Sequence, residues 1–418
     1  MDHDLDIRTE CRGYCLKLAD FDTYLLILPQ NNLSPDSGFT IQQLTSLNAI
    51  AAADWNRLAN TTNPFLSHEF LQGLEECDCL EAHGWIPNHL VVYEQTRPVG
   101  ALPLYLKTNS YGEFVFDWSW AEAYERAGGQ YYPKLVSAIP FTPVQGPRLL
   151  IDNSHSTPDA IKAVLLRTIV EITATRGISS FHCLLPETAD EPGYDTFEFL
   201  PRKSIQFHWH NHDYRDFDDF LDHLTSKKRK QIKRERRLVR DTGLDIEVLT
   251  GDMITPSQWR VFHEFYCSTF HRRWGSPRLT LEFFQLLSER LPRQTLLLLA
   301  SRNRDYVAGA FAMLSGDTLY GRHWGCNSQY ANLHFELCYY QTIDYCIRNG
   351  LTTLDAGVQG EHKLSRGFEP VITWSRHWIR HQGFRKAIRD FLDRESVEID
   401  EYVTQLNSHL PYKDAKVE

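Results

Sequence analysis

The sequence predicts an α/β (α+β) protein made of two similar halves, each a mixed central sheet flanked by helices. Residues 68–75 and residues 281–288 both carry apolar side chains at helical spacing. In each half an apolar strand pair follows, with a turn between its two strands. Because the same order of elements occurs twice in one chain, we expect an internal duplication.

The two strand pairs have the composition of hairpins in a buried sheet. The first runs through residues 89–104 with a turn at Thr96 and Arg97, and the second runs through residues 296–312. Val, Leu and Ala fill the strands with few polar interruptions, which is typical of strands covered on both faces.

An aromatic strand, a helix and a short strand complete each half. The predicted segments are the strands 114–120 and 319–324, the helices 160–176 and 335–349, and the short strands 179–184 and 352–355. Both helices end at a glycine, Gly177 or Gly350, which is an ordinary helix stop. This order matches the acyltransferase fold called GNAT, so we predict tandem GNAT-like domains.

Composition shifts along the chain suggest four segments. They are an N-terminal extension at 1–42, a first GNAT-like domain at 43–200, a second at 201–395 and a C-terminal tail at 396–418.

Charge and cysteine usage limit the class of protein. The net charge of −10 over 418 residues argues against a chain-wide nucleic-acid binder, so we expect no DNA partner. The nine cysteines are scattered and show no C-x-x-C spacing, which indicates reduced thiols. The first residues lack the pattern of a signal peptide, and the apolar run 24–28 is too short to span a bilayer. We therefore expect a cytoplasmic protein without a transmembrane segment.

A strongly basic helix is predicted at residues 225–242. Between Thr225 and Arg240 the sequence has nine basic residues and one acid. Such charge density favours a polyanion, such as tRNA, through counterion release. The candidate polyanion-binding residues are Lys227, Lys228, Arg229, Lys230, Lys233 and Arg234. The alternative is a charged surface helix whose bases pair with nearby acids, which begin at Asp216.

A polar, glycine-containing loop follows the last short strand, at residues 355–368. Glu361, His362 and Lys363 are consecutive there and are the candidate catalytic residues. A carboxylate or an imidazole can take a proton from an amine, and a cation can stabilise an oxyanion. Gln359 and Arg366 are candidate substrate-binding neighbours. A solvated loop without a chemical role is the alternative.

The strand at 319–324 and the following helix add further substrate-binding candidates. They are Arg322, His323, Glu336 and Tyr339, all expected near the same cleft. His323 could equally pack in the core. Trp118, the candidate from the first half, belongs to an aromatic cluster that either lines an apolar pocket or joins the core.

Three alternating histidines, His208, His210 and His212, share one face of a predicted strand. Their spacing is compatible with a metal ion, but no fourth ligand is evident. We therefore predict no metal site, and a partly buried polar face instead.

Four sequence blocks resemble one known family. They are residues 116–124 with 131–135, residues 140–149, residues 207–209 and 217–221 with the basic run, and residues 357–363. Together, over roughly residues 45–395, they are similar to a FemAB-like branch of the GNAT superfamily, predicted N-acyltransferases of peptidoglycan biosynthesis and recognition. The resemblance implies tandem GNAT-like domains with a basic insertion in the second. It also implies kinship with transferases that move an amino acid from aminoacyl-tRNA to an amine of a peptidoglycan precursor.

One departure leaves the donor open. GNAT enzymes bind the pyrophosphate of coenzyme A with a glycine-rich loop, whereas the corresponding residues 326–333 contain no glycine. The co-substrate is therefore either acyl-CoA or aminoacyl-tRNA, and we expect no tightly bound cofactor.

The resulting hypothesis is an N-acyltransferase acting on the amine of a small metabolite or a cell-wall precursor. In this hypothesis Glu361 or His362 takes the proton of the amine. Lys363, Arg322 and Arg366 stabilise the developing negative charge. Gln359 and Glu336 orient the substrate. We expect one active cleft because the first half has no counterpart of residues 361–363. The rival hypothesis is a non-catalytic GNAT-like module that recognises a cell-wall or anionic polymer.

Overall fold

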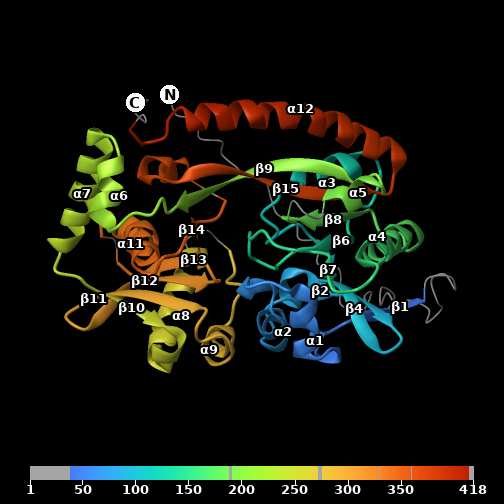
Figure 1. Ribbon diagram of the computed structural model, residues 1–418, viewed down its shortest axis with the longest axis horizontal. Helices are drawn as coiled ribbons and strands as arrows, with labels where there is room; N and C mark the ends of the chain where they lie inside the picture. Colours follow the sequence, from blue (N-terminus) through green and yellow to red (C-terminus); the bar gives the residue numbers. More distant parts are fainter. Residues whose placement is uncertain (1–37, 188–190, 272–274, 329, 359, 414–418) are drawn as a thin grey trace.

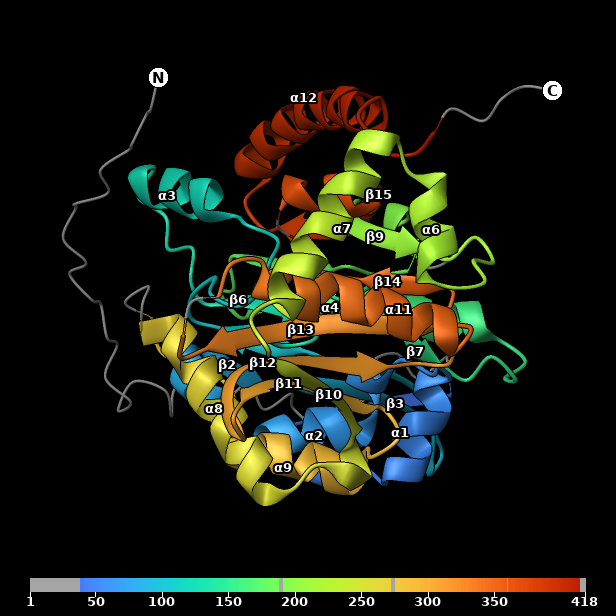
Figure 2. The same ribbon diagram turned by 90° about the vertical axis from the view of Figure 1, so that its left-hand side faces the viewer.

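The protein has a mixed α/β fold with two sheets, seen in a computed structural model that describes residues 38–187, 191–271, 275–328, 330–358 and 360–413 (Figure 1). The long helix α12 (Gln382–Asn407) lies along one side of the molecule, and α1, α2, α8 and α9 lie on the opposite side (Figures 1 and 2). None of the described helices is both long enough and apolar enough to cross a membrane. The apolar run 24–28 lies outside the described residues.

The smaller sheet has four antiparallel strands in the order β1-β3-β4-β7. They are β1 (Phe39–Leu44), β3 (His89–Glu94), β4 (Arg97–Leu102) and β7 (Leu150–Ile151). The first predicted hairpin is confirmed, since β3 pairs with β4 across a turn at Gln95 and Thr96. The suggested boundary after residue 42 falls inside β1.

The larger sheet has eleven strands in the order β10-β11-β12-β13-β14-β9-β15-β8-β6-β5-β2. They are β10 (Asp245–Thr250), β11 (Thr295–Arg302), β12 (Asp305–Leu314), β13 (Thr318–Cys326), β14 (Thr353–Asp355), β9 (Leu200–His210), β15 (Glu369–Ile379), β8 (Ser180–Leu184), β6 (Lys134–Ser137), β5 (Tyr105–Lys107) and β2 (Trp85–Pro87). The second predicted hairpin is confirmed as β11 and β12. Because β15 pairs with β9 on one edge and β8 on the other, one sheet runs through both halves.

The helices cover the faces of these sheets. They are α1 (Ala52–Ala59), α2 (His68–Glu76), α3 (Trp118–Arg126), α4 (Pro158–Thr175), α5 (Glu191–Asp195), α6 (Phe217–His223), α7 (Ser226–Arg240), α8 (Pro256–His271), α9 (Leu281–Arg290), α10 (Leu333–Phe335), α11 (Gln341–Arg348) and α12. The predicted helices at 68–75, 160–176 and 281–288 are confirmed by α2, α4 and α9. The helix predicted at 335–349 contains a π-helical turn, Glu336–Tyr340, and such turns often occur at functional sites.

The two helices that look alike in sequence pack against each other where the halves meet. The rings of Phe70 on α2 and Phe283 on α9 are 5.3 Å apart, edge to face. A Cβ at Gly73 would lie 2.9 Å from Leu286 Cδ2, so this glycine permits the close approach. The largest hydrophobic cluster includes Trp55 and Phe284, so the halves share a core.

The prediction of a strand at residues 114–120 is wrong. Phe114 has a φ of 63°, which turns the chain out of an extended path, and Trp118 begins α3. Asp117 just before α3 has its carboxylate turned inward to Lys134, at 2.5 Å. Alternation of aromatic residues is typical of a strand, but it does not reveal the positive φ of Phe114 or the buried ion pair of Asp117 with Lys134.

Candidate active site

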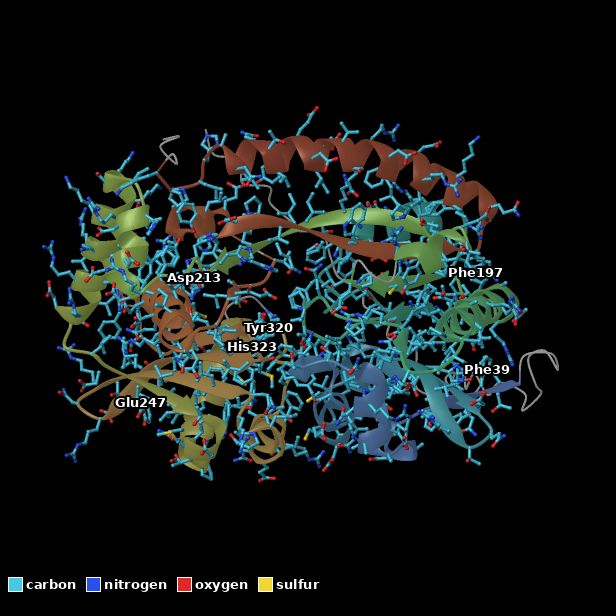
Figure 3. All side chains as sticks on the ribbon, in the orientation of Figure 1. Phe39, Phe197, Asp213, Glu247, Tyr320 and His323 are labelled. Carbon is cyan, nitrogen blue, oxygen red and sulfur yellow. The ribbon has the colours of Figure 1, made fainter. Side chains whose placement is uncertain are left out.

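The strands β13 and β14 part after a short parallel pairing. Only Thr318–Tyr320 of β13 pair with Thr353–Asp355 of β14. Beyond Tyr320, β13 continues to Cys326 with β12 as its strand partner in the described sheet. We call residues 321–326 of β13 the open edge; Tyr320 and His323 mark its start in Figure 3. An unpaired strand edge offers N–H and C=O groups to a ligand.

The chain that follows β14 forms a short 3₁₀ turn at residues 361–366, which we call the 361–366 turn. It is bounded by Gly360, with φ 109°, and Gly367, with φ 90°. A Cβ on Gly360 would lie 2.3 Å from the His362 ring, so this position needs glycine. The turn directs Lys363 inward and leaves His362 exposed.

Lys363 is buried behind this turn, with 3% of its surface exposed. Its ammonium donates to the carbonyl oxygens of Ala356, at 2.6 Å, and Gly357, at 2.9 Å. Burial lowers the pKa of Lys363 from 10.5 to about 8; the charge of Asp355 opposes this shift and that of Arg322 adds to it. Lys363 can therefore exchange a proton closer to neutral pH than an ordinary lysine.

Asp355, at the end of β14, ties the two parting strands together. Its Oδ2 accepts a hydrogen bond from Arg322 on β13 at 3.0 Å, and its Oδ1 accepts the N–H of Gly357 at 2.7 Å. Burial raises the pKa of Asp355, but the charges and hydrogen bonds around it, chiefly those of Arg322 and His208, lower the pKa by more. The pKa of this carboxyl group therefore lies below its usual range. The carboxylate stays ionised and holds Arg322 beside the open edge.

The first half also reaches this region. The Gln206 amide on β9 donates to the carbonyl oxygen of Pro143 at 2.9 Å, and Pro143 belongs to the sequence block 140–149. A Cβ on Gly357 would lie 4.0 Å from Pro143 Cγ. His208, also on β9, lies 3.8 Å from Asp355 Oδ1. The candidate site therefore lies where both halves contribute residues.

His362 is placed to accept a proton. Its Nε2 lies 3.0 Å from the hydroxyl oxygen of Tyr339, in the π-helical turn. Partial burial of its ring, together with the charges of Arg366 and Lys363, lowers the pKa of His362, so the imidazole is neutral at neutral pH. Glu361 is exposed and accepts a hydrogen bond from Tyr402 on α12 at 2.5 Å.

Arg366 and Glu336 are both paired with the basic helix α7. Arg366 donates to Glu235 Oε2 at 3.0 Å and to the His362 carbonyl at 2.8 Å. Glu336 Oε1 lies 3.1 Å from Arg236. Glu235 is the only acid in the basic run, and it faces inward. These two predicted substrate-binding residues therefore attach α7 to the 361–366 turn and to the π-helical turn.

The side chains of the other predicted substrate-binding residues pack elsewhere or lie outside the described residues. His323 packs in an aromatic cluster, stacked on Phe311 at 6.0 Å, and burial lowers its pKa to about 3. Trp118 is 40% exposed at the start of α3, with its ring 4.8 Å from that of Tyr111. Gln359 lies outside the described residues.

The basic run forms α7, which stands beside α6 (Figures 1 and 2). Arg229 pairs with Asp222 at 2.9 Å and Lys233 pairs with Asp218 at 3.1 Å, as the surface-helix interpretation expects. The remaining candidates make no ion pair with described residues; they are Lys227, Lys228, Lys230 and Arg234. The ion pairs fit the surface-helix interpretation for Arg229 and Lys233, and polyanion binding by the other bases stays a prediction.

A buried polar cluster in the first half was missed in the sequence. Lys134 is fully buried and donates to Asp117 at 2.5 Å, to Glu113 at 2.8 Å and to Ser110 at 2.7 Å. Tyr131 donates to Asp117 at 2.6 Å. Burial raises the pKa of Glu113 to about 7. The signal was two charged residues, Asp117 and Lys134, inside the aromatic blocks 116–124 and 131–135, although their pairing is not visible in one sequence.

Within the described part of the chain, no group of three or more His, Cys, Asp and Glu side chains could hold a metal ion. The histidines at 208 and 210 lie instead near the end of β9.

No curated protein matches the sequence. Among solved structures, the crystal structure of FemX is similar with a TM-score of 0.50 and 10% identity, covering 83% of this chain and 100% of that one. A tandem GNAT protein from the clavulanic acid biosynthesis pathway has a TM-score of 0.43 and 11% identity, covering 82% and 99%. A protein of unknown function from Bacteroides thetaiotaomicron has a TM-score of 0.48 and 13% identity, covering 81% and 99%. At such identities likeness shows the fold alone, and the FemX comparison confirms the predicted GNAT-like α/β class.

The family model FemAB-like, described as peptidoglycan biosynthesis/recognition, matches residues 46–414. This match spans most of the chain and confirms the family predicted from the four sequence blocks. It supports an acyl- or aminoacyl-transferase type of function connected with peptidoglycan. The chain therefore belongs to the FemAB-like family.

Proposed function

We propose that this protein is an N-acyltransferase that moves an acyl or aminoacyl group from an activated donor to an amine, beside the open edge of β13. The observation that carries the proposal is the surroundings of Lys363. Its cation is buried next to a parted strand pair and hydrogen-bonded to two carbonyl oxygens. Such a cation can respond to negative charge that develops during a reaction.

The chemistry follows from ordinary acyl transfer. A neutral amine attacks the donor carbonyl, a C–N bond forms, and the C–O bond of an ester or the C–S bond of a thioester breaks. Lys363 is hydrogen-bonded to the chain that leaves β14, and in this proposal it stabilises the oxyanion together with N–H groups of the open edge. His362 accepts the proton that the amine loses, because its lowered pKa keeps the imidazole neutral.

The donor we favour is aminoacyl-tRNA, with acyl-CoA as the alternative. Exposed cations on α7, Lys227, Lys230 and Arg234, support a polyanionic donor. The acceptor in this proposal is an amine of a cell-wall precursor, in line with the family description. A cytoplasmic location is part of the same proposal, since both donors are made there.

The reaction is tested by mass spectrometry of products after incubation with aminoacyl-tRNA or acyl-CoA and an amine-bearing peptidoglycan precursor. Lys363→Met and His362→Gln should each lower the transfer rate by about 10²–10⁴-fold. Lys386→Met, an exposed lysine on α12, is the matched control and should keep the full rate. Unchanged turnover by the Lys363→Met protein would defeat the proposal. Saturable polymer binding without product from any donor would favour the non-catalytic alternative.

The donor is tested by charge reversal on α7. A triple variant, Lys227→Glu with Lys230→Glu and Arg234→Glu, should weaken tRNA binding and flatten its salt dependence, while coenzyme A binding stays the same. The matched control reverses three exposed charges on α12: Lys386→Glu, Arg389→Glu and Arg394→Glu. Equal tRNA affinity for wild type and the α7 variant would remove aminoacyl-tRNA from the proposal.

A further inference from the structure

A separate cleft lies between α6, α7, β10 and the helix formed by the π-helical turn and α11, and we call it the α6–α7 cleft. Its volume is about 670 Å³, within the range of small-molecule sites. Four acidic and four basic side chains line it, together with five apolar ones. Because the charges balance, the lining suits a ligand that carries both signs rather than a polyanion.

The deepest charged group of the α6–α7 cleft is Glu336. Its side chain is 5% exposed, and its Oε1 is paired with Arg236 at 3.1 Å and with Gln341 at 2.8 Å. Its other oxygen, Oε2, is buried and has no hydrogen-bond partner among the described residues. A buried carboxylate oxygen without a donor costs free energy, so this oxygen is ready to accept from a ligand.

The mouth of the α6–α7 cleft carries positive charge. The side chains of Lys233 and Arg348 are 54% and 74% exposed, and Arg240 is exposed and makes no ion pair with described residues. Asp344, deeper in, is 12% exposed. Negative charge therefore lies deep in the cleft and positive charge at its mouth. Two exposed acids at the start of α6, Asp216 and Asp218, also line the mouth.

We propose that the α6–α7 cleft binds an amino acid or short peptide that has a free ammonium group and a free carboxylate. The ammonium donates to Glu336 Oε2, the carboxylate pairs with Arg240, and an apolar side chain packs on Phe217 and Val239. Arg236 and Arg240 are one helical turn apart on α7, so the two anchor points have about the separation of the two ends of a dipeptide. The proposal does not depend on the transferase reaction.

The probe is the dipeptide L-leucyl-L-alanine, titrated into the full-length protein by calorimetry. We expect saturable binding, and about tenfold or greater weakening when the dipeptide is N-acetylated or when its carboxylate is amidated. Absence of saturable binding by the free dipeptide, or equal binding by both blocked forms, would overturn the proposal.

Two substitutions locate the binding. Glu336→Gln and Arg240→Ala should each weaken the dipeptide by about tenfold or more, because each removes one charged partner. Arg237→Ala, on the outer face of the same helix and outside the cleft lining, is the control and should bind as wild type does. If the Glu336→Gln protein does not fold, Arg240→Ala and the blocked dipeptides still decide the matter. Wild-type affinity in the Arg240→Ala protein would place the binding elsewhere.

Discussion

Each half of the molecule buries a lysine, and the two lysines have opposite surroundings. Lys134 in the first half has two carboxylates within 2.5 Å and 2.8 Å, those of Asp117 and Glu113. Lys363 in the second half donates to carbonyl oxygens of its own loop. Burial lowers the pKa of Lys134, but the two carboxylates raise it overall, whereas burial prevails at Lys363 and lowers its pKa to about 8.

The strands around the two lysines differ in how fully their edges are paired. β6, which carries Lys134, is paired on both edges, with β5 and with β8. β13, in contrast, parts from β14 after Tyr320. A cation enclosed by counterions is held for stability, while a cation whose hydrogen bonds go only to neutral carbonyl groups can respond to new charge. The difference supports the expectation of one active site, which stays a prediction.

The largest expected effect comes from removing the enclosed cation. Lys134→Met should lower the free energy of unfolding by about 3–5 kcal/mol, because it leaves the buried carboxylate of Asp117 without its counterion. Lys363→Met should cost no more than about 1–2 kcal/mol, because only neutral carbonyl groups lose their partner. Urea unfolding at neutral pH measures both. Equal losses would erase the distinction between the two lysines.

The attachment of α7 offers a second, smaller effect. Glu235→Gln should lower the free energy of unfolding by about 2–4 kcal/mol, since Arg366 is left buried without its carboxylate partner. Amide hydrogen exchange should also become faster across the 361–366 turn, because Arg366 holds the His362 carbonyl. The control is Glu398→Gln, an exposed position on α12. Unchanged exchange in that turn would show that α7 does not support it.

The lowered pKa of Lys363 is directly measurable. NMR of isotope-labelled lysine side chains should show Lys363 titrating near pH 8, while Lys134 stays protonated there. The folded pKa lies below the unfolded value, so the native state binds fewer protons between the two. Relative to Lys363→Met, wild type should therefore gain stability as the pH rises from about 8 to 10.5. Titration of Lys363 at its ordinary pKa would contradict the proposed role.

The smallest effect is expected on the outer side of α7. Asp222→Asn removes the partner of Arg229, but these side chains are 67% and 30% exposed. The loss of stability should be below about 1 kcal/mol and should vanish in high salt. A double-mutant cycle with Arg229→Ala gives the coupling energy. A larger value would mean that the pairs between α6 and α7 act as a network.

Local patterns in the sequence predicted the helices and strands whose conformation depends on residues close to them in the chain. The hairpins β3–β4 and β11–β12 follow from apolar runs around turn residues, and α7 follows from its helical charge pattern. The strand at 114–120 failed because alternation does not reveal the positive φ of Phe114. The π-helical turn inside the helix at 335–349 has no local signature that we recognised.

Periodicity, glycines and short motifs are local properties, so the amino-acid sequence was enough to predict the tandem α/β architecture, the family and the position of the loop that carries His362 and Lys363. Which charged side chains are paired and which are buried became visible in the folded protein. Arg366 meets Glu235 across 131 positions, and Arg236 meets Glu336 across 100. Pairing and burial set the free energy and the pKa of a charged group, and both depend on distant parts of the chain that only folding brings together.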